Sequence, residues 1–339
     1  MTDAITEDNM QKLIFAILLS AIVCMVVGRF LIPMLRRLKF GQTERQEGPK
    51  SHLKKTGTPT MGGIMIIVAI VIGTMALSSG SLHYALPAML VTVAYALVGF
   101  LDDFIKVRFK RSLGLRAYQK IIAQFGIALV IAIYCQRVIG TVIELPFFNA
   151  EFDLGVFYVP FAMFLIIATV NSVNLIDGID GLSSGVTLIY AFTMAIVFIY
   201  LSEIGAQSGQ IEQTAGYEGL IVFAGTVAGG CLGFLRYNSH PAQVFMGDTG
   251  SLALGGAVAM MALFSRAALL LPIMGGCYVA TSISVILQVG SYKLRRKRIF
   301  KMAPLHHHFE LKGYNETKIV AGYMIITTFL CLICLLAYV

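Results

Sequence analysis

The chain has 339 residues, of which 57% are hydrophobic and 13% are charged, and its formal net charge at pH 7 is +8. An ordinary soluble domain carries about 25% charged residues, so this composition excludes a disordered, collagenous or disulfide-scaffold protein and argues against a soluble enzyme. In such an apolar chain the excess of Lys and Arg is typical of cytoplasmic loops, and we expect no nucleic-acid partner.

Ten apolar stretches are candidates for membrane spans, because a hydrocarbon core about 30 Å thick needs roughly 20 apolar residues per helix. They are 13–35, 62–79, 86–101, 118–137, 157–173, 183–201, 218–236, 249–264, 268–290 and 317–338. We therefore predict an all-α, polytopic integral membrane protein with about ten transmembrane helices, formed by a single domain over residues 1–339. Pro272, Gly275 and Gly276 predict a kink or a break in the ninth span.

Most basic residues lie in the connections that follow the first, third, seventh and ninth spans. Loops rich in Lys and Arg stay in the cytoplasm, so these connections are predicted to be cytoplasmic. With an even number of spans, the N-terminus and the C-terminus then both lie outside, on the periplasmic or extracellular side.

The first cytoplasmic loop, within residues 36–61, runs into the sequence HLKKTGTPTMGG over residues 52–63. Lys, Thr and Gly together suit contact with a phosphate. The spacing is not that of a Walker A motif, and for this segment alone a flexible basic loop is the favoured interpretation.

The third span ends in LDDFIK, which places Asp102 and Asp103 at the end of an apolar helix. On a continuing helix Lys106 lies one turn after Asp102, on the same face. The pair indicates either a site for a hard cation, with Lys106 facing a phosphate, or an ordinary ion pair at a helix end.

The fifth span runs into NLIDGIDGL, where the two glycines allow tight turns. Asn174, Asp177 and Asp180 suit hydrogen bonds to a nucleobase or a ribose, or further ligands of a metal. The alternative is a polar turn between two spans, with Asp or Ser capping the next helix.

Asp248 lies in VFMGDTGS, where the eighth apolar stretch begins. It is interpreted either as a magnesium ligand beside a helix N-terminus, which also favours phosphate, or as the N-cap of that helix. Phe245 in the same segment either stacks on a base or only packs.

The last cytoplasmic loop, within residues 291–316, contains His306, His307 and His308 in the sequence PLHHHFELKG. Three consecutive His residues point to different faces of any regular element, so a zinc site made from them alone is not expected. They suit hydrogen bonds to a diphosphate or binding of its metal, or they are solvated side chains of a polar loop.

Together these segments place Asp, His and Lys at the cytoplasmic ends of different spans, which is the inventory for binding a diphosphate through magnesium at a membrane surface. An active site is expected in the loops around 36–61, 102–120, 174–182, 236–250 and 291–316. A channel or pump would place ionisable residues near the bilayer midplane, where the sequence offers no convincing carboxylate. The GxxxG ladder of Gly225, Gly229 and Gly233 predicts helix packing.

With these motifs assembled, the chain resembles the polyprenyl-phosphate N-acetylhexosamine-1-phosphate transferase superfamily over almost its whole length. The resemblance is carried by GTPTMGG, LDDFIK, NLIDGIDGL, VFMGDTGS and PLHHHFELKG. The last of these resembles the branch that transfers an N-acetylmuramoyl-pentapeptide phosphate rather than an N-acetylglucosamine phosphate.

The resemblance implies that UDP-N-acetylmuramoyl-pentapeptide and undecaprenyl phosphate give lipid I and UMP in peptidoglycan synthesis, at the cytoplasmic face of the bacterial inner membrane. It also implies Mg²⁺ as cofactor, a homodimer in the lipid bilayer and a bent ninth span. The alternatives are the same chemistry on UDP-N-acetylglucosamine and, in a different class, a transporter or flippase of lipid-linked intermediates.

Carried over to this sequence, the resemblance makes Asp248 the expected magnesium ligand and Asp102 the base for the lipid phosphate, with Asp103 assisting near the metal. The residues expected to position phosphates are Lys106, Lys120, His306 and His307. The uridine-side pocket is expected from Asn174, Asp177, Gly178, Asp180, Asn238 and Phe245, and contacts to a nucleotide or inhibitor from Lys55 and Gln288.

The attack by the lipid phosphate depends little on a general base, because a phosphate monoester with a second pKa of about 6 is substantially ionised at neutral pH. Direct attack by the lipid phosphate is therefore favoured, and a covalent phospho-enzyme intermediate remains the open alternative.

Overall fold

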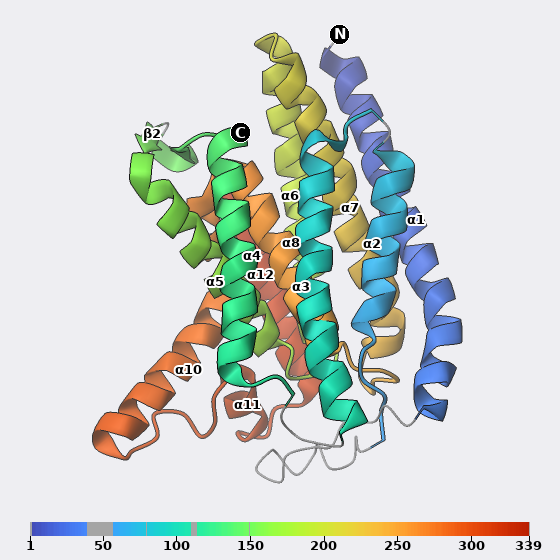
Figure 1. Cartoon of the computed structure of the whole chain (residues 1–339), viewed down its shortest axis with the longest axis vertical. Coiled ribbons are helices and arrows are strands. Elements are labelled where there is room, and N and C mark those ends of the chain that lie inside the picture. The colour runs from blue at the N-terminus through green and yellow to red at the C-terminus, as the bar shows by residue number, and fades with distance from the viewer. Residues whose placement is uncertain (1, 39–56, 79, 110–113, 149, 339) are drawn as a thin grey trace.

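Residues 2–38, 57–78, 80–109, 114–148 and 150–338 are described by a computed structural model of the chain (Figure 1). The longer helices are α1 (Thr2–Arg37), α2 (Gly63–Leu77), α3 (Leu82–Arg108), α4 (Ala117–Val138), α5 (Tyr158–Ile176), α6 (Leu182–Gln207), α7 (Ile211–Asn238), α8 (Gly247–Phe264), α10 (Gly276–Arg295) and α12 (Glu316–Leu335). The short elements are β1 (Val142–Leu145), β2 (Ala150–Asp153), α9 (Leu271–Met274), α11 (Leu305–Glu310) and three single turns of 3-10 helix, Pro146–Phe148, Gly155–Phe157 and Ala268–Leu270.

Within the described residues, eight helices are each long and apolar enough to cross a membrane. The segment Ala268–Met274 and helix α10 pass the same test together, and they are bent by 77° where Gly275 separates them. The prediction of an all-α, polytopic membrane protein is confirmed, and so is the break in the ninth apolar stretch. The number ten stays a prediction, because α2 has only 15 residues, about 22 Å at 1.5 Å per residue.

The two ends of the chain lie at the same end of the helix bundle, as Figure 1 shows. Helix α11 lies at the other end, together with the last turns of α3, α5 and α7 and the first turn of α8. This arrangement agrees with an even number of crossings. It does not say which end faces the cytoplasm, so the orientation of the termini stays a prediction.

Helices α6, α7 and α8 form the interior of the bundle, while α1, α4 and α12 leave most of their surface exposed. Small residues allow the close packing that holds helices together in lipid. A Cβ atom on Gly229 of α7 would lie 2.3 Å from the carbonyl oxygen of Ile17 in α1, and one on Gly233 would lie 2.5 Å from that of Ala21. The predicted packing role of the glycine ladder is therefore confirmed.

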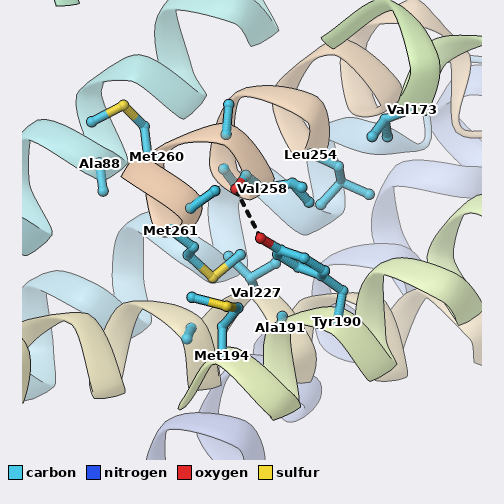
Figure 2. Close-up of a cluster of buried hydrophobic side chains, with 14 of the residues drawn as sticks. Ala88, Val173, Tyr190, Ala191, Met194, Val227, Leu254, Val258, Met260 and Met261 are labelled. Carbon is cyan, nitrogen blue, oxygen red and sulfur yellow. Dashed lines mark hydrogen bonds between the residues drawn. The ribbon is translucent and has the colours of Figure 1, made fainter. Parts of the chain in front are cut away.

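The packing of α6 against α8 is shown in Figure 2. Tyr190 of α6 crosses to α8 and its hydroxyl donates to the carbonyl oxygen of Val258 at 3.5 Å. Met194 and Met261 lie on the same side of α8 as Tyr190, whereas Met260 points toward Ala88 of α3, and all three methionines are at most 3% exposed. Flexible thioether side chains suit irregular gaps, and the result is a closed core between α6 and the second half of α8.

A small hairpin that the sequence analysis did not predict lies at the same end as the termini. Strands β1 and β2 pair antiparallel with Glu144 opposite Glu151. The amide of Glu144 donates to the carbonyl oxygen of Arg266 at 2.8 Å, which ties the hairpin to the segment after α8. Four-residue strands are too short to give a periodic signal in the sequence.

Candidate functional site

Three carboxylates from two helices meet at the end of the bundle that carries α11. Asp102 and Asp103 lie on the last turns of α3, and Asp248 lies in the first turn of α8. One carboxylate oxygen from each of the three lies within 4.8 Å of the others. Asp102 and Asp103 are each only 3% exposed, so the structure places concentrated negative charge in a sheltered position.

The close approach of α3 and α8 depends on glycine. A Cβ atom on Gly99, one turn before the two aspartates, would lie 2.1 Å from the carbonyl oxygen of Asp248. Likewise a Cβ atom on Gly63 would lie 2.2 Å from the Cα atom of Gly250. Gly62 and Gly63 of GTPTMGG therefore pack against the VFMGDTGS segment, a role that the sequence pattern did not indicate.

Two lysines balance part of this charge. The Nζ atom of Lys106 lies 2.8 Å from Oδ2 of Asp248 and 3.7 Å from Oδ1 of Asp103, and it also pairs with Asp102 one turn earlier. The Nζ atom of Lys120, from α4, lies 3.0 Å from the same Oδ2 of Asp248. The predicted i,i+4 ion pair exists, but it forms one part of a five-residue charged cluster.

Neutral donors fix the orientation of the carboxylates. Asp103 accepts hydrogen bonds from the amide and the hydroxyl of Thr249 at 2.9 and 2.7 Å. The side-chain amide of Asn174 donates to Asp248 at 2.7 Å and to the hydroxyl of Ser251 at 2.8 Å. Asp248 makes no capping hydrogen bond, since Met246 occupies the N-cap position of α8. The alternative interpretation of Asp248 as an N-cap is therefore wrong.

The turn between α5 and α6 borders this cluster. Asp177 is partly buried there, and burial together with the negative charges of Asp248, Asp103 and Asp180 raises the pKa of its carboxyl group. A Cβ atom on Gly178 would lie 2.1 Å from Nε2 of His306. The turn thus brings the backbone against the His-rich helix α11.

The three consecutive histidines point in different directions, as predicted. His306 is buried against Gly178, whereas Nδ1 of His307 lies 2.6 Å from Oε2 of Glu310. Nδ1 of His308 accepts a hydrogen bond from the amide of Lys301 at 3.1 Å. The histidines therefore belong to three different environments.

Several predicted substrate-binding residues hold backbone segments around the site. Asn238 accepts from the amide of Gly181 and donates to the carbonyl oxygen of Val244, both at 2.9 Å. Gln288 makes three hydrogen bonds of 3.0 Å to the backbone of residues 299–300. Their contacts with a substrate stay predictions.

The remaining two predicted residues differ in how far the structure describes them. Phe245 is partly buried and its backbone pairs with Pro59 and Gly62. Lys55 lies outside the described residues.

The sequence pattern did not single out His240 and Glu316. Nδ1 of His240 lies 3.0 Å from Oδ2 of Asp180 and 3.6 Å from Oε2 of Glu316. His240 follows α7 and Glu316 begins α12, so the two are 76 positions apart and no local spacing connects them. Thr249 and Ser251 were also missed, although their place within three residues after Asp248 was a usable signal.

The donor set of the first cluster fits a divalent cation. Hard cations such as Mg²⁺ and Ca²⁺ prefer carboxylate oxygens, and Asp102, Asp103 and Asp248 offer three within a small volume. The lysine ammonium groups that now face Asp248 are also suitable partners for phosphate. The arrangement can therefore hold a cation and an anionic substrate side by side.

Comparisons with known proteins agree with one another. The sequence model of the family described as "Glycosyl transferase family 4" matches residues 85–266. A protein of Caldanaerobacter subterraneus subsp. tengcongensis is 53% identical over 317 residues, which covers 94% of this chain and 96% of that protein. One of Alkaliphilus metalliredigens is 50% identical over 343 residues (97% and 99%), and one of Clostridium novyi 46% over 326 residues (96% of each). All three relatives bear the name phospho-N-acetylmuramoyl-pentapeptide-transferase.

Proposed function

The chain belongs to the phospho-N-acetylmuramoyl-pentapeptide transferase family, and from that premise we propose that it transfers phospho-N-acetylmuramoyl-pentapeptide from its UDP-linked donor to undecaprenyl phosphate. The products are lipid I and UMP. The observation that carries the proposal is the meeting of Asp102, Asp103 and Asp248 with two lysines at one end of a membrane-embedded bundle.

The cofactor of the proposed reaction is Mg²⁺, and Asp248 would hold it with Asp103 and Asp102 beside it. When bound, the ion would neutralise charge on the diphosphate and on the leaving UMP. Asn174 and Thr249 serve this arrangement by fixing the orientation of the Asp248 and Asp103 carboxylates, through the hydrogen bonds of 2.7–2.9 Å described above.

The two lysines bring the anionic substrates together. A lipid phosphate and a nucleotide diphosphate repel each other, and preorganised ammonium groups lower that cost in the transition state. Lys106 and Lys120 reach the cluster from α3 and α4, so each can pair with a phosphate when substrate arrives. His306 lies against Gly178 with the ring of His307 beside it, and we assign both histidines to contacts with the phosphates.

The proposed chemical step is direct attack by the lipid phosphate. One of its oxygens forms a bond to the sugar-linked phosphorus of the donor, and the bond from that phosphorus to the bridging oxygen breaks. UMP leaves with the electron pair of that bond. Asp102 accepts the proton from the small fraction of acceptor that still carries one, since the phosphate is already largely ionised at neutral pH.

We place the site at the cytoplasmic face of the bacterial inner membrane, in an enzyme that functions as a homodimer. Support for the face comes from the basic residues of the connections at this end, including Arg236 and Lys293. The dimer rests on the family resemblance.

A donor-swap assay tests the proposal. Purified protein in lipid is given undecaprenyl phosphate, Mg²⁺ and either UDP-N-acetylmuramoyl-pentapeptide or UDP-N-acetylglucosamine, and UMP release is measured. We expect release with the first donor only. Release with the second donor alone would show the related N-acetylglucosamine transferase, and transport of a lipid-linked substrate across sealed vesicles without UMP would show a flippase.

A further inference from the structure

A second cluster of titratable side chains lies at the same end of the bundle, on the other side of the α5–α6 turn. It consists of Asp180 from that turn, His240 from the segment after α7, and Glu316 from the first turn of α12. Asp180 and Glu316 are sheltered, with 1% and 9% of their side chains exposed, whereas His240 is 40% exposed.

The geometry makes His240 a bridge between two carboxylates. Its Nδ1 atom lies 3.0 Å from Oδ2 of Asp180 and 3.6 Å from Oε2 of Glu316. The same Oδ2 of Asp180 also accepts a hydrogen bond from the amide of Ala242 at 3.1 Å. Two carboxylates this close repel each other, and Nδ1 of His240 lies near both of them, within hydrogen-bond distance of Asp180.

The bridge connects segments that border the nucleotide-sugar site. The α5–α6 turn carries Asp177 and Gly178, and Gly178 contacts His306 of α11. Helix α11 is followed by the short connection 311–315 and then by α12, whose first residue is Glu316. His240 therefore completes a closed series of contacts, here called the ring, that joins the α5–α6 turn, the segment after α7, and helices α11 and α12.

We propose that His240 is a positioning residue for the nucleotide-sugar donor, which fixes the α5–α6 turn relative to α11 and α12 by bridging Asp180 and Glu316. The inference rests on the proposed function, because it assigns the turn to the donor side of the site. The residues of the acceptor side and of the chemical step, Lys106 and Asp248 among them, are not in the ring. Loss of the bridge then weakens donor binding and leaves the chemical step nearly intact.

The test is a set of variants assayed by UMP release with each substrate varied in turn. His240→Phe keeps a ring but removes both nitrogen atoms, and we expect the KM for the UDP-linked donor to rise about tenfold, as for a coupling of 1.4 kcal/mol. The kcat changes less than about twofold and the KM for undecaprenyl phosphate stays the same. His240→Gln, which retains a donor, recovers part of the loss.

Glu316→Gln supplies the second measurement. Alone it raises the donor KM less than His240→Phe does. In the double variant with His240→Phe, Glu316→Gln raises the donor KM no further. Without the imidazole the charge of Glu316 only repels that of Asp180, and Glu316→Gln removes that charge. If the two substitutions instead raised the donor KM independently and additively, the inferred bridge would be wrong.

The matched control is His83→Phe. Nε2 of His83 also lies 3.6 Å from a carboxylate oxygen, that of Glu212, at the end of the bundle where α3 and α7 begin. The control leaves both KM values unchanged. Donor binding measured without acceptor, and unfolding temperature in detergent, separate a binding defect from a folding defect.

Three further results would overturn the inference: an unchanged donor KM in His240→Phe, a loss confined to kcat, or an equal loss in the control. A Zn²⁺-dependent rise in unfolding temperature that His240→Phe abolishes would assign the cluster to a cation instead. Failure of the wild-type protein to release UMP from the donor would instead contradict the proposed function itself.

Discussion

Two clusters of acidic side chains lie at one end of this bundle, and they differ in what surrounds the carboxylates. Asp102, Asp103 and Asp248 face the ammonium groups of two lysines. Among the contacts within the described residues, Asp180 and Glu316 face the imidazole of His240, and Asp180 also accepts from a backbone amide.

The difference suits the first cluster to the chemical step and the second cluster to positioning. Lysine ammonium groups on flexible stems can exchange a carboxylate for a phosphate or give way to a cation. The imidazole of His240 lies beside a carboxylate that also accepts a hydrogen bond from a backbone amide. Such a contact has less freedom to exchange partners, so it suits a fixed connection.

Removal of magnesium gives the largest expected effect. Chelation with EDTA lowers UMP release by at least about 1,000-fold, because the developing charge on the leaving nucleotide loses several kcal/mol of stabilisation. Activity returns when Mg²⁺ is added in excess. Glu316→Gln and His240→Phe recover with the same Mg²⁺ dependence as the wild type if the ion belongs to the Asp248 cluster.

Asp248→Asn comes next, with turnover expected to fall by about 100- to 1,000-fold at saturating Mg²⁺. The amide retains the size of the side chain but removes the charge that faces Lys106, Lys120 and the cation. The measurement is kcat from UMP release, with the unfolding temperature as a check that the variant folds. Wild-type turnover in a folded Asp248→Asn protein would mean that the first cluster is not the catalytic one.

The helices and the motifs of the site follow from local patterns in the sequence, and the contacts between them do not. Apolar runs predicted the spans, and Pro and Gly predicted the break before α10. Asp248 and the acidic pair of α3 were recognised because charged side chains next to apolar helices are costly.

Local patterns could not show what packing decides. His240 and Glu316 are unremarkable in their own segments and meet only because α7 and α12 end and begin side by side around the α5–α6 turn. Gly99 is one small residue among many, and its role depends on the direction from which α8 approaches α3. Such features require the relative placement of helices, on which periodicity and spacing carry no information.

Gly99→Ala tests how closely the first cluster depends on that packing. Its Cβ atom would lie 2.1 Å from the carbonyl oxygen of Asp248, so α8 must shift. We expect turnover to fall about 10- to 100-fold, as for a displacement near 1 Å at a catalytic group, while donor binding through the second cluster changes little.

Gly126→Ala in α4 is the control for this substitution, because a Cβ atom there meets nothing within 4 Å. It keeps full turnover. Equal turnover in the two variants would show that the position of Asp248 tolerates the shift.

Asp177 gives the smallest expected effect, and it lies between the two clusters. Burial raises the pKa of its carboxyl group first, and the charges of Asp248 and Asp103 on one side and Asp180 on the other raise it further. A carboxyl group that ionises less readily in the folded state costs stability as the pH rises from its ordinary pKa toward the raised one. In EDTA, Asp177→Asn should therefore unfold at nearly the wild-type temperature near pH 4 and at a progressively higher relative temperature toward pH 8.

The pKa of Asp153 is shifted in the opposite direction to that of Asp177, so Asp153 serves as the comparison. Hydrogen bonds from the hydroxyl of Thr141 and the amide of Gly155 lower the pKa of its exposed carboxyl group. The stability that this group contributes is present above its ordinary pKa and is lost as the pH falls through the lowered one, so Asp153→Asn is less stable than the wild type at neutral pH and the difference closes in acid. If Asp177→Asn followed that pattern instead, Asp177 would be held ionised by a positive partner, and it would no longer mark the boundary between two negatively charged clusters.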